Sequence, residues 1–476
     1  MTGTLGDIND RGLPDAGRAA DFLCRLREAG FSKVRLCVNS RRSERLGVEN
    51  QSLKICEYGE SLMYIVEAAL EGEYCRAYSG SLEDAEEIVR QLRETAGTFG
   101  DRELPEDIKE SKDFRGKRWR RMDREAAAES LKRAEREALA CEKAHFVEMC
   151  EYQQYEETIV LVDEHMHYLA DDDGNCTFTV RVAAKDGDSA AEATKYGIIG
   201  SGESFGGQEA ESGREDETEE EEFGRQVCQT ARSAAKAAGL GLHGETVSSG
   251  AYPIVLENCV MAELTGHYLP MFYGENILYH VSPLAGKEQK QVGCPSLFIE
   301  EDPFCSGGTR RRSIDDEGTP VTRTVLVNKG VFEKALHNKK SAAAAGAEST
   351  GNGFKPEVTA DIGTGATNVI LSSKGDTFSR REMLEASEGG IYITKIEGMF
   401  AGADTESGNF SLLAFGNRIV DGQAGTALNP FTVSGNICEL WRDIEMIGDD
   451  PAYRTTDGAC ASSPSVKVKS LMVSGE

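Results

Sequence analysis

The sequence has no long apolar run, no secretory signal and no paired-cysteine motif. No stretch approaches the ~18 consecutive apolar residues of a membrane-spanning helix. The first residues, MTGTLGDINDRGLPDAGR, lack the basic start and apolar core of a secretory signal. The 13 cysteines are scattered singly without any CxxC pair, so we expect reduced thiols that mainly fill the core. These absences predict a cytoplasmic chain that does not act at a membrane.

Positive charge is also scarce, because 53 lysines and arginines stand against 81 aspartates and glutamates. The net charge of −28 argues against DNA or RNA as a partner, since nucleic-acid binding depends on neutralising phosphates. The basic runs 115–124 and 310–312 are expected to pair with carboxylates of this protein or of a partner. Residues 209–222 hold nine acids, and we interpret them as a solvated loop or linker. Docking of a basic partner is the alternative for this acidic segment.

Common enzyme motifs are missing. There is no P-loop. Residues 239–244 fit G-x-G-x-x-G but follow a helical pattern instead of a strand, which favours a helix end and turn. His165 and His167 could share one metal from a strand, but no third ligand stands at a local spacing. Glu263 and His267 can share a helix face, yet their number and order differ from those of a zinc-peptidase helix. We therefore expect no zinc site in this chain.

Residue periodicity predicts an α+β fold with two domains. Residues 1–200 read as an N-terminal mixed α/β domain with helices on a sheet, and residues 171–175 read as a turn before its last strand. Residues 201–245 are expected to form an acidic linker and a helix. From 246 to 476, short strand-like runs alternate with Gly, Asn and Asp turns, which predicts a large, mainly antiparallel β domain. The expected N-terminal helices are 16–30, one with its apolar stripe at 85–96, and 124–143. The expected strands are 33–39, 52–58, 62–69, 146–152, 155–162 and 177–183.

One series of motifs in the C-terminal half is more specific. Asp302-Pro303 precedes the glycine pair 307–308, and the run DDEGTPVTR (315–323) precedes ESTGNG (348–353). Further motifs follow at 390–394 (GIYIT), 408–411 (GNFS) and 433–437 (VSGNI). Together these motifs resemble the TldD/PmbA family. The resemblance covers nearly the whole chain and is specific over about 250–476.

The resemblance implies a part in peptide cleavage. In the TldD kind of subunit, a C-terminal-domain helix carries two histidines around a glutamate, and a late cysteine completes a zinc site. Here the ligand positions fall near Gly266 and Met271, and Cys460 is misplaced, so the chain resembles the metal-free TldE (PmbA) kind. The resemblance thus implies a heterodimer with a TldD-like subunit that holds the zinc. Its substrates would be small or unfolded peptides, such as leader peptides of modified peptides.

The resemblance also suggests one substrate-binding loop. Ser349, Thr350, Gly351 and Asn352 are small and polar or lack a side chain, so they are expected to let a peptide approach the backbone closely. A structural turn is the alternative. The turn at 315–318 is interpreted as structural, and no catalytic residue or metal ligand is expected. Two other functions stay open: a stand-alone peptide-binding or regulatory homodimer of the gyrase-modulator kind, and a divergent peptidase that uses Glu263 and His267.

Overall fold

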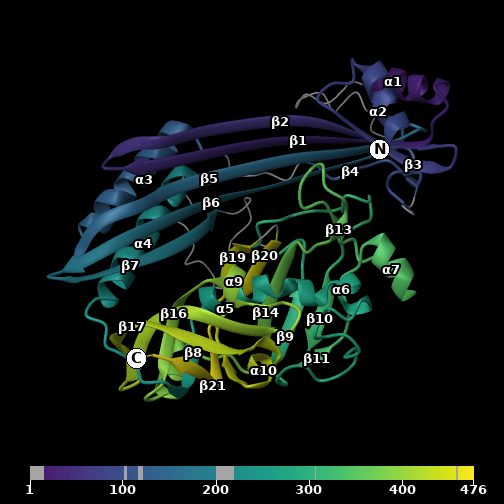
Figure 1. The fold of residues 1–476 in the computed structure, drawn as a ribbon. Helices are drawn as coiled ribbons and strands as arrows, with labels where there is room; N and C mark the ends of the chain where they lie inside the picture. The colour runs from purple at the N-terminus through teal and green to yellow at the C-terminus, as the bar shows by residue number, and fades with distance from the viewer. Residues whose placement is uncertain are drawn as a thin grey trace.

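The computed structural model describes residues 16–100, 104–115, 122–199, 219–305, 307–456 and 459–475. A sheet of long strands lies over a C-terminal domain built from shorter strands (Figure 1). Helices occur together with mostly antiparallel sheets, which confirms the predicted α+β class.

The upper sheet has seven strands in the order β3-β2-β1-β5-β6-β4, with β7 beside β6. The strands are β1 (Ser32–Glu49), β2 (Ser52–Leu70), β3 (Glu73–Ser79), β4 (Lys112–Asp113), β5 (Ala144–Asp163), β6 (Tyr168–Asp186) and β7 (Ser189–Ile199). The runs 52–58 and 62–69, predicted as two strands, form the single strand β2, and 146–152 and 155–162 likewise form β5. The polar residues between these runs break the apolar alternation but not the strand, because both neighbouring strands continue to pair with them.

Four helices cover the two ends of one sheet face. They are α1 (Ala16–Glu28), α2 (Ala85–Thr95), α3 (Arg124–Leu139) and α4 (Glu219–Leu240). Alternate residues of β1 point to this face, so Leu36 and Val38 pack against α1 and α2 while Leu46 and Val48 pack against α3 and α4. The side chains of Asp84 and Asp123 cap α2 and α3 by accepting backbone N–H bonds. The core of the sheet therefore lies on its outer face and leaves the other face for the C-terminal domain.

Helix α4 lies in the segment 201–245 that was interpreted as a linker with a helix. Its apolar side, which includes Phe223, Val227 and Ala231, packs with α3, β6 and β7. The last four acids of the acidic segment, residues 219–222, form the first turn of α4, where the positive end of the helix dipole favours negative charge. Residues 209–218 lie outside the described part of the chain.

The outer edge of β2 is open over most of its length. β3 pairs with β2 only from Tyr64 to Leu70, and no other described strand pairs with that edge over residues 52–63. Leu53 and Tyr58 are 38% and 52% exposed there. Unpaired backbone groups along such an edge can accept a further strand.

The C-terminal domain contains three sheets. One has the order β11-β10-β9-β14-β20-β19, a second joins β12 to β13, and the third has the order β17-β16-β15-β8-β21-β18. β17 also pairs with β21, so five strands of the third sheet close into a ring. Its strands are β8 (Gly250–Leu256), β9 (Leu297–Glu301), β10 (Thr324–Asn328), β11 (Val331–Phe332), β12 (Gly353–Phe354), β13 (Gly363–Thr364), β14 (Asn368–Ser373), β15 (Ile391–Glu397), β16 (Asn409–Val420), β17 (Gln423–Asn436), β18 (Ile444–Ile447), β19 (Ala452–Thr456), β20 (Ala459–Ser463) and β21 (Val466–Ser474).

A single apolar core joins the two large sheets of this domain. Trp441 and Phe272 stack at its centre and are both buried. The helices are α5 (Asn258–His267), η2 (Leu269–Phe272), α6 (Gly274–Leu278), α7 (Lys339–Ala345), α8 (Arg380–Glu385), α9 (Met399–Gly402) and α10 (Ile437–Arg442). All 13 cysteines are free thiols. Among the described residues, no helix combines the length and apolarity needed to cross a bilayer.

Candidate functional site

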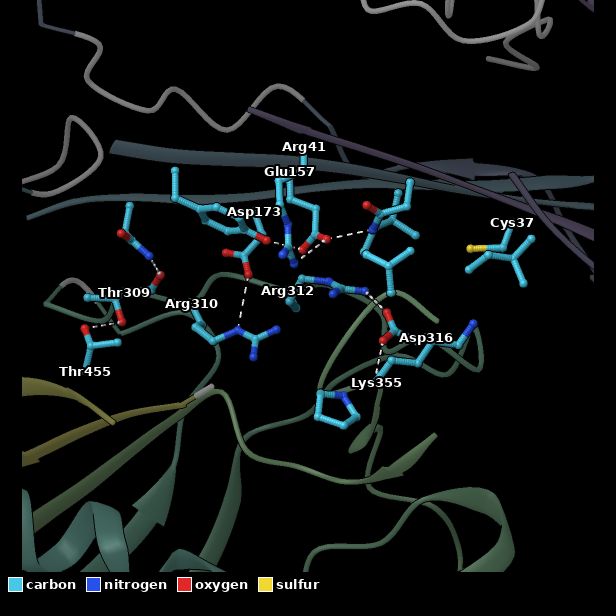
Figure 2. Close-up of a pocket in the computed structure, with 17 residues that line it drawn as sticks. Cys37, Arg41, Glu157, Asp173, Thr309, Arg310, Arg312, Asp316, Lys355 and Thr455 are labelled. Atoms are coloured by element: carbon cyan, nitrogen blue, oxygen red, sulfur yellow. Dashed lines mark hydrogen bonds and ion pairs between the residues drawn. The ribbon is translucent and has the colours of Figure 1, made fainter. Parts of the chain in front are cut away.

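A polar cleft lies between the long sheet and the C-terminal domain. Side chains alternate across a strand, so Asn39 and Arg41 of β1, Glu157 of β5 and Asp173 of β6 all point away from the helices. The opposite wall comes from residues 309–316 and 355–358 and from Thr455 of β19. The cleft encloses about 220 Å³. Figure 2 shows Arg41, Glu157 and Asp173 facing Arg310 and Arg312, with Lys355 extending past Asp316 toward the side of Cys37.

The upper wall is organised around Glu157, which is 5% exposed. Its carboxylate accepts hydrogen bonds from Asn39 Nδ2 at 2.6 Å, Tyr155 OH at 2.6 Å and Arg41 Nη2 at 3.3 Å. The Arg41 guanidinium also lies over the Tyr155 ring, 5.0 Å from its centroid. These three partners are therefore positioned by one carboxylate.

Two buried aspartates of β6, Asp171 and Asp173, meet the run 310–312 of the C-terminal domain. Arg310 Nε and the backbone N–H of Arg311 donate to Asp173, at 3.3 and 2.8 Å. Arg312, 1% exposed, lies with its Nε 3.6 Å from Asp171 and donates from Nη2 to Asp316 at 2.9 Å. These contacts confirm that the run 310–312 pairs with the protein's own carboxylates. They join the two domains across the cleft (Figure 2).

The prediction of a turn at residues 171–175 is wrong. These residues lie inside β6 and pair in register with residues 155–159 of β5. Asp, Gly and Asn favour turns when they are solvated, but here Asp171, Asp172 and Asp173 are at most 3% exposed. Asp171 and Asp173 are stabilised by donors more than 130 residues away, and a local sequence pattern carries no information about such donors.

The loop predicted to bind substrate lies inside the C-terminal domain. Thr350 and Asn352 are buried, and Asn352 Nδ2 donates to both oxygens of Glu301 and to the carbonyl of Gly365. Gly351 has φ +77°, and a Cβ there would stand 2.3 Å from the Pro320 carbonyl oxygen. Ser349 is half-buried and donates to the His337 carbonyl. None of the four lines the cleft, and substrate contact by this loop stays a prediction.

The turn at 315–318 lies beside this loop. The buried Asp315 carboxylate accepts backbone N–H bonds from Glu317, Thr319 and Gly353, at 2.8–3.0 Å. The next residue, Asp316, accepts from the backbone N–H of Lys355 at 2.8 Å. The turn thus connects the Arg312 side of the cleft to the loop that contains Asn352.

Glu301 gives the protein a pH-dependent stability. Complete burial raises the pKa of Glu301 from 4.5 to about 7. The folded state therefore binds a proton that the unfolded state has already released, so this contribution is lost as pH rises from about 4.5 through 7. The stability advantage of wild type over Glu301→Gln is expected to fall by on the order of 3 kcal/mol between pH 5 and pH 8. Urea unfolding at both pH values measures it, and a difference that does not change with pH would contradict the prediction.

The helix and late cysteine indicated by the family resemblance are neighbours. α5 packs on β20, the strand that contains Cys460. Gly266 and Met271 are buried, and Cys460 is fully buried. On α5, burial raises the pKa of Glu263, while His267 Nε2 lies 3.3 Å from the Ala403 carbonyl oxygen. No hydrogen bond joins Glu263 to His267 within the described residues.

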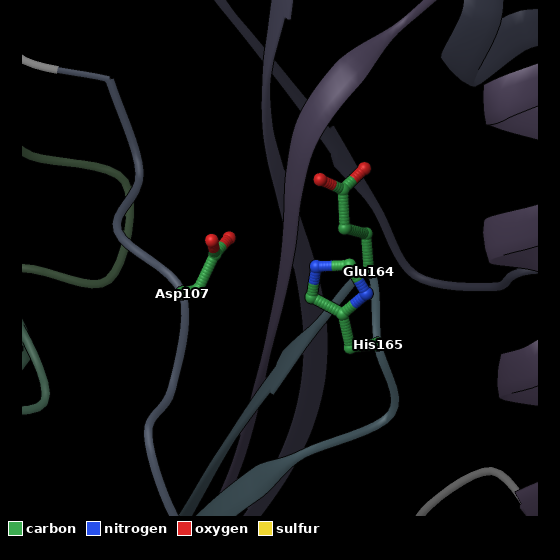
Figure 3. Close-up of side chains that lie close together, drawn as sticks. All are labelled: Asp107, Glu164 and His165. Atoms are coloured by element: carbon green, nitrogen blue, oxygen red, sulfur yellow. The ribbon is translucent and has the colours of Figure 1, made fainter.

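A different group of three residues has the spacing of metal ligands. Ligand atoms of Asp107, Glu164 and His165 lie within 4.8 Å of one another (Figure 3). Lys33 donates to Asp107 at 3.0 Å and already supplies a positive charge there. His165 and His167, predicted on a strand, lie in the turn between β5 and β6, where Met166 has φ +67°. Their rings are 6.2 Å apart, and His167 contacts Asp163 instead.

Sequence reasoning did not single out Asn39, Arg41 or Lys355. One signal was available for the first two, since the apolar residues Leu36 and Val38 alternate in β1 with polar positions that continue through Arg41. This alternation indicates a polar sheet face that faces something other than the helices. Lys355 stands in a loop without periodicity, so only its position in the fold identifies it.

Comparison with known proteins identifies relatives of the C-terminal domain. Residues 249–475 match the family described as the PmbA/TldA metallopeptidase C-terminal domain. A metalloprotease TldD homolog of Buchnera aphidicola is 25% identical over 259 residues, which cover 51% of this chain and 52% of that protein. A metalloprotease of Methanothermobacter thermautotrophicus is 29% identical over 276 residues, 54% of this chain and 56% of that one. The chain thus spans about half the length of these curated relatives.

The whole fold resembles a solved structure. TldE from Thermococcus kodakarensis superposes with a TM-score of 0.82 over 96% of this chain and 100% of that chain. The two sequences are 19% identical, so this likeness shows only that the two proteins share the same fold over both domains.

Proposed function

We propose that this chain, whose residues 249–475 match the PmbA/TldA metallopeptidase C-terminal domain, is the metal-free subunit of a heterodimeric zinc peptidase. The partner is a TldD-like chain that holds the zinc, and the pair acts in the cytoplasm on small or unfolded peptides. Leader peptides of modified peptides belong to this substrate class. This chain binds no cofactor and supplies part of the wall around the peptide.

The packing of α5 on β20 is the observation that carries the proposal. The resemblance assigns zinc binding in the TldD kind to a helix and a late cysteine, and the corresponding elements are neighbours here. Gly266 offers no ligand atom and Met271 is a buried core residue. Burial raises the pKa of the Cys460 thiol, which disfavours the thiolate that zinc binds. A catalytic zinc needs three protein ligands, so this pair of elements supports a role without metal.

The purified chain is expected to contain no stoichiometric zinc and to cleave no peptide, whereas its mixture with a TldD-like partner cleaves unfolded peptides. Metal analysis and a peptide-cleavage assay measure both properties. Cys460→Ser serves as the matched control and should leave the activity of the mixture unchanged, because this thiol is not a ligand. Zinc and activity in the isolated chain would contradict the proposal.

The same assay distinguishes the two other functions. Activity of the isolated chain that disappears in both Glu263→Gln and His267→Ala would support a divergent peptidase. Lack of activity with every TldD-like partner, together with a stable homodimer that binds peptides, would support a stand-alone binding or regulatory protein. The first outcome is not expected, since Glu263 and His267 are not joined by a hydrogen bond and the half-buried His267 contacts a backbone carbonyl.

A further inference from the structure

We propose that the cleft between the long sheet and the C-terminal domain binds a peptide carboxylate, with Lys355 as its main cation. This inference rests on the proposed function, because it specifies which peptides the chain would hold. The group is either an acidic side chain or the carboxylate at a peptide's C-terminus.

The cleft has more hydrogen-bond donors than its own acceptors can use. The Lys355 ammonium has no hydrogen-bond or ion-pair partner among the described residues, although the side chain is only half exposed. Nε of Arg41 is also buried without a hydrogen-bond partner, and Nε of Arg312 makes no hydrogen bond beyond its 3.6 Å ion-pair contact with Asp171. A guanidinium has five N–H groups and an ammonium has three, so these three residues keep substantial unused capacity.

The carboxylates of the cleft cannot take up this capacity, because each already accepts several bonds. Glu157 accepts from Asn39, Arg41 and Tyr155. Asp173 accepts from Arg310 and from the backbone of Arg311, and Asp316 from Arg312 and from the backbone of Lys355. An incoming carboxylate brings about four further acceptor sites and matches the unused donors.

Size and the Lys355 ammonium select a single carboxylate. The lining contains the cations Arg41, Arg310, Arg312 and Lys355 and the anions Glu157, Asp173 and Asp316, and Arg312 also pairs with Asp171, which is not part of the lining. Among these cations, Lys355 alone has no ion pair with a described residue, so one monoanion can pair with it, whereas a doubly charged phosphate would bring an uncompensated negative charge into the cleft. The volume of about 220 Å³ is below the ~300–1,000 Å³ of sites for drug-sized ligands, so it suits one side chain or a chain end.

The side-chain oxygen of Asn39 is an unused hydrogen-bond acceptor that suits a peptide in particular. Oδ1 of Asn39, a residue 7% exposed, is buried without a donor while its Nδ2 is held by Glu157. A peptide carries an N–H group beside each carbonyl and can supply the missing donor, which sulfate or chloride cannot. Donors for the carboxylate and an acceptor for the backbone thus occur in one cleft.

Three decapeptides of otherwise identical sequence test the proposal with the full chain. The first has a central Gln and an amidated C-terminus, the second a central Glu and an amidated C-terminus, and the third a central Gln and a free C-terminus. Fluorescence anisotropy should give a dissociation constant about tenfold lower for the second, the third or both than for the first. The peptide with the lower dissociation constant identifies whether the bound carboxylate comes from an acidic side chain or from the C-terminus.

Lys355→Gln should remove this preference while the chain stays folded, with a lower thermal unfolding midpoint because the lysine charge favours the ionised forms of the buried carboxylates of Glu67 and Asp316. Lys340→Gln, at an exposed lysine of α7, is the matched control and should retain the preference. Equal binding of all three peptides, or a preference that survives Lys355→Gln, would overturn the carboxylate site and leave the proposed function standing. Failure to bind any peptide would instead count against the proposed function itself.

Discussion

Replacing Arg312 with alanine is expected to lower the free energy of unfolding by about 3–5 kcal/mol. The guanidinium is 1% exposed and lies between Asp171 and Asp316, which belong to different domains. Removing it leaves two carboxylates buried without their cation, and a buried charge without a partner is far more costly than a broken surface pair. Equilibrium unfolding in urea, followed by circular dichroism, measures the change.

Two further variants separate charge from packing at this position. Arg312→Met keeps most of the volume, so a loss close to that of Arg312→Ala would assign the effect to charge. Adding Asp171→Asn to Arg312→Met should recover part of the loss, because one uncompensated carboxylate is then removed. Arg323→Ala is the control: Arg323 pairs with Glu300 but is 60% exposed, and its removal should cost less than ~1 kcal/mol. An equal loss from Arg323→Ala and Arg312→Ala would contradict the argument.

The helices could be predicted well because their signals are local. The prediction 16–30 corresponds to α1, and 124–143 corresponds to α3 with an earlier end at Leu139. Each combines a 3.6-residue apolar stripe with capping or terminating residues within a few positions. The long strands were harder to predict, since residues 59–61 of β2 and 153–154 of β5 lack an apolar face and are held by pairing with other strands.

The cleft could not be predicted, because its pairs join distant parts of the sequence. Asp171 and Arg312 were each noticed as members of charged runs, but 141 positions separate them. The sequence predicted a turn at 171–175 and pairing of 310–312 with carboxylates that it did not identify, while the fold buries Asp171 and Arg312 against each other. A motif shared with a family can indicate that a segment matters, as at 315–323 and 348–353, without saying what its side chains contact.

Replacing Asn352 with alanine is expected to lower the free energy of unfolding by about 3 kcal/mol. Asn352 is fully buried, and its amide donates to both oxygens of Glu301 at 2.9 and 3.0 Å and to a backbone carbonyl. Alanine removes these donors and leaves Glu301 with the bonds from Thr367 alone. Ser349→Ala, in the same loop but half-buried, should cost no more than ~1 kcal/mol.

The combination of stability and peptide binding decides what this loop does. If the loop is structural, Asn352→Ala at a temperature where it stays folded binds peptide with an unchanged dissociation constant. A large rise in that constant with little loss of stability would instead support the predicted substrate contact. Asn352→Asp adds a second carboxylate beside Glu301, so it should be more destabilising than Asn352→Ala at pH 8. At pH 5 this extra loss should shrink, because Glu301, whose pKa is raised to about 7, is then protonated.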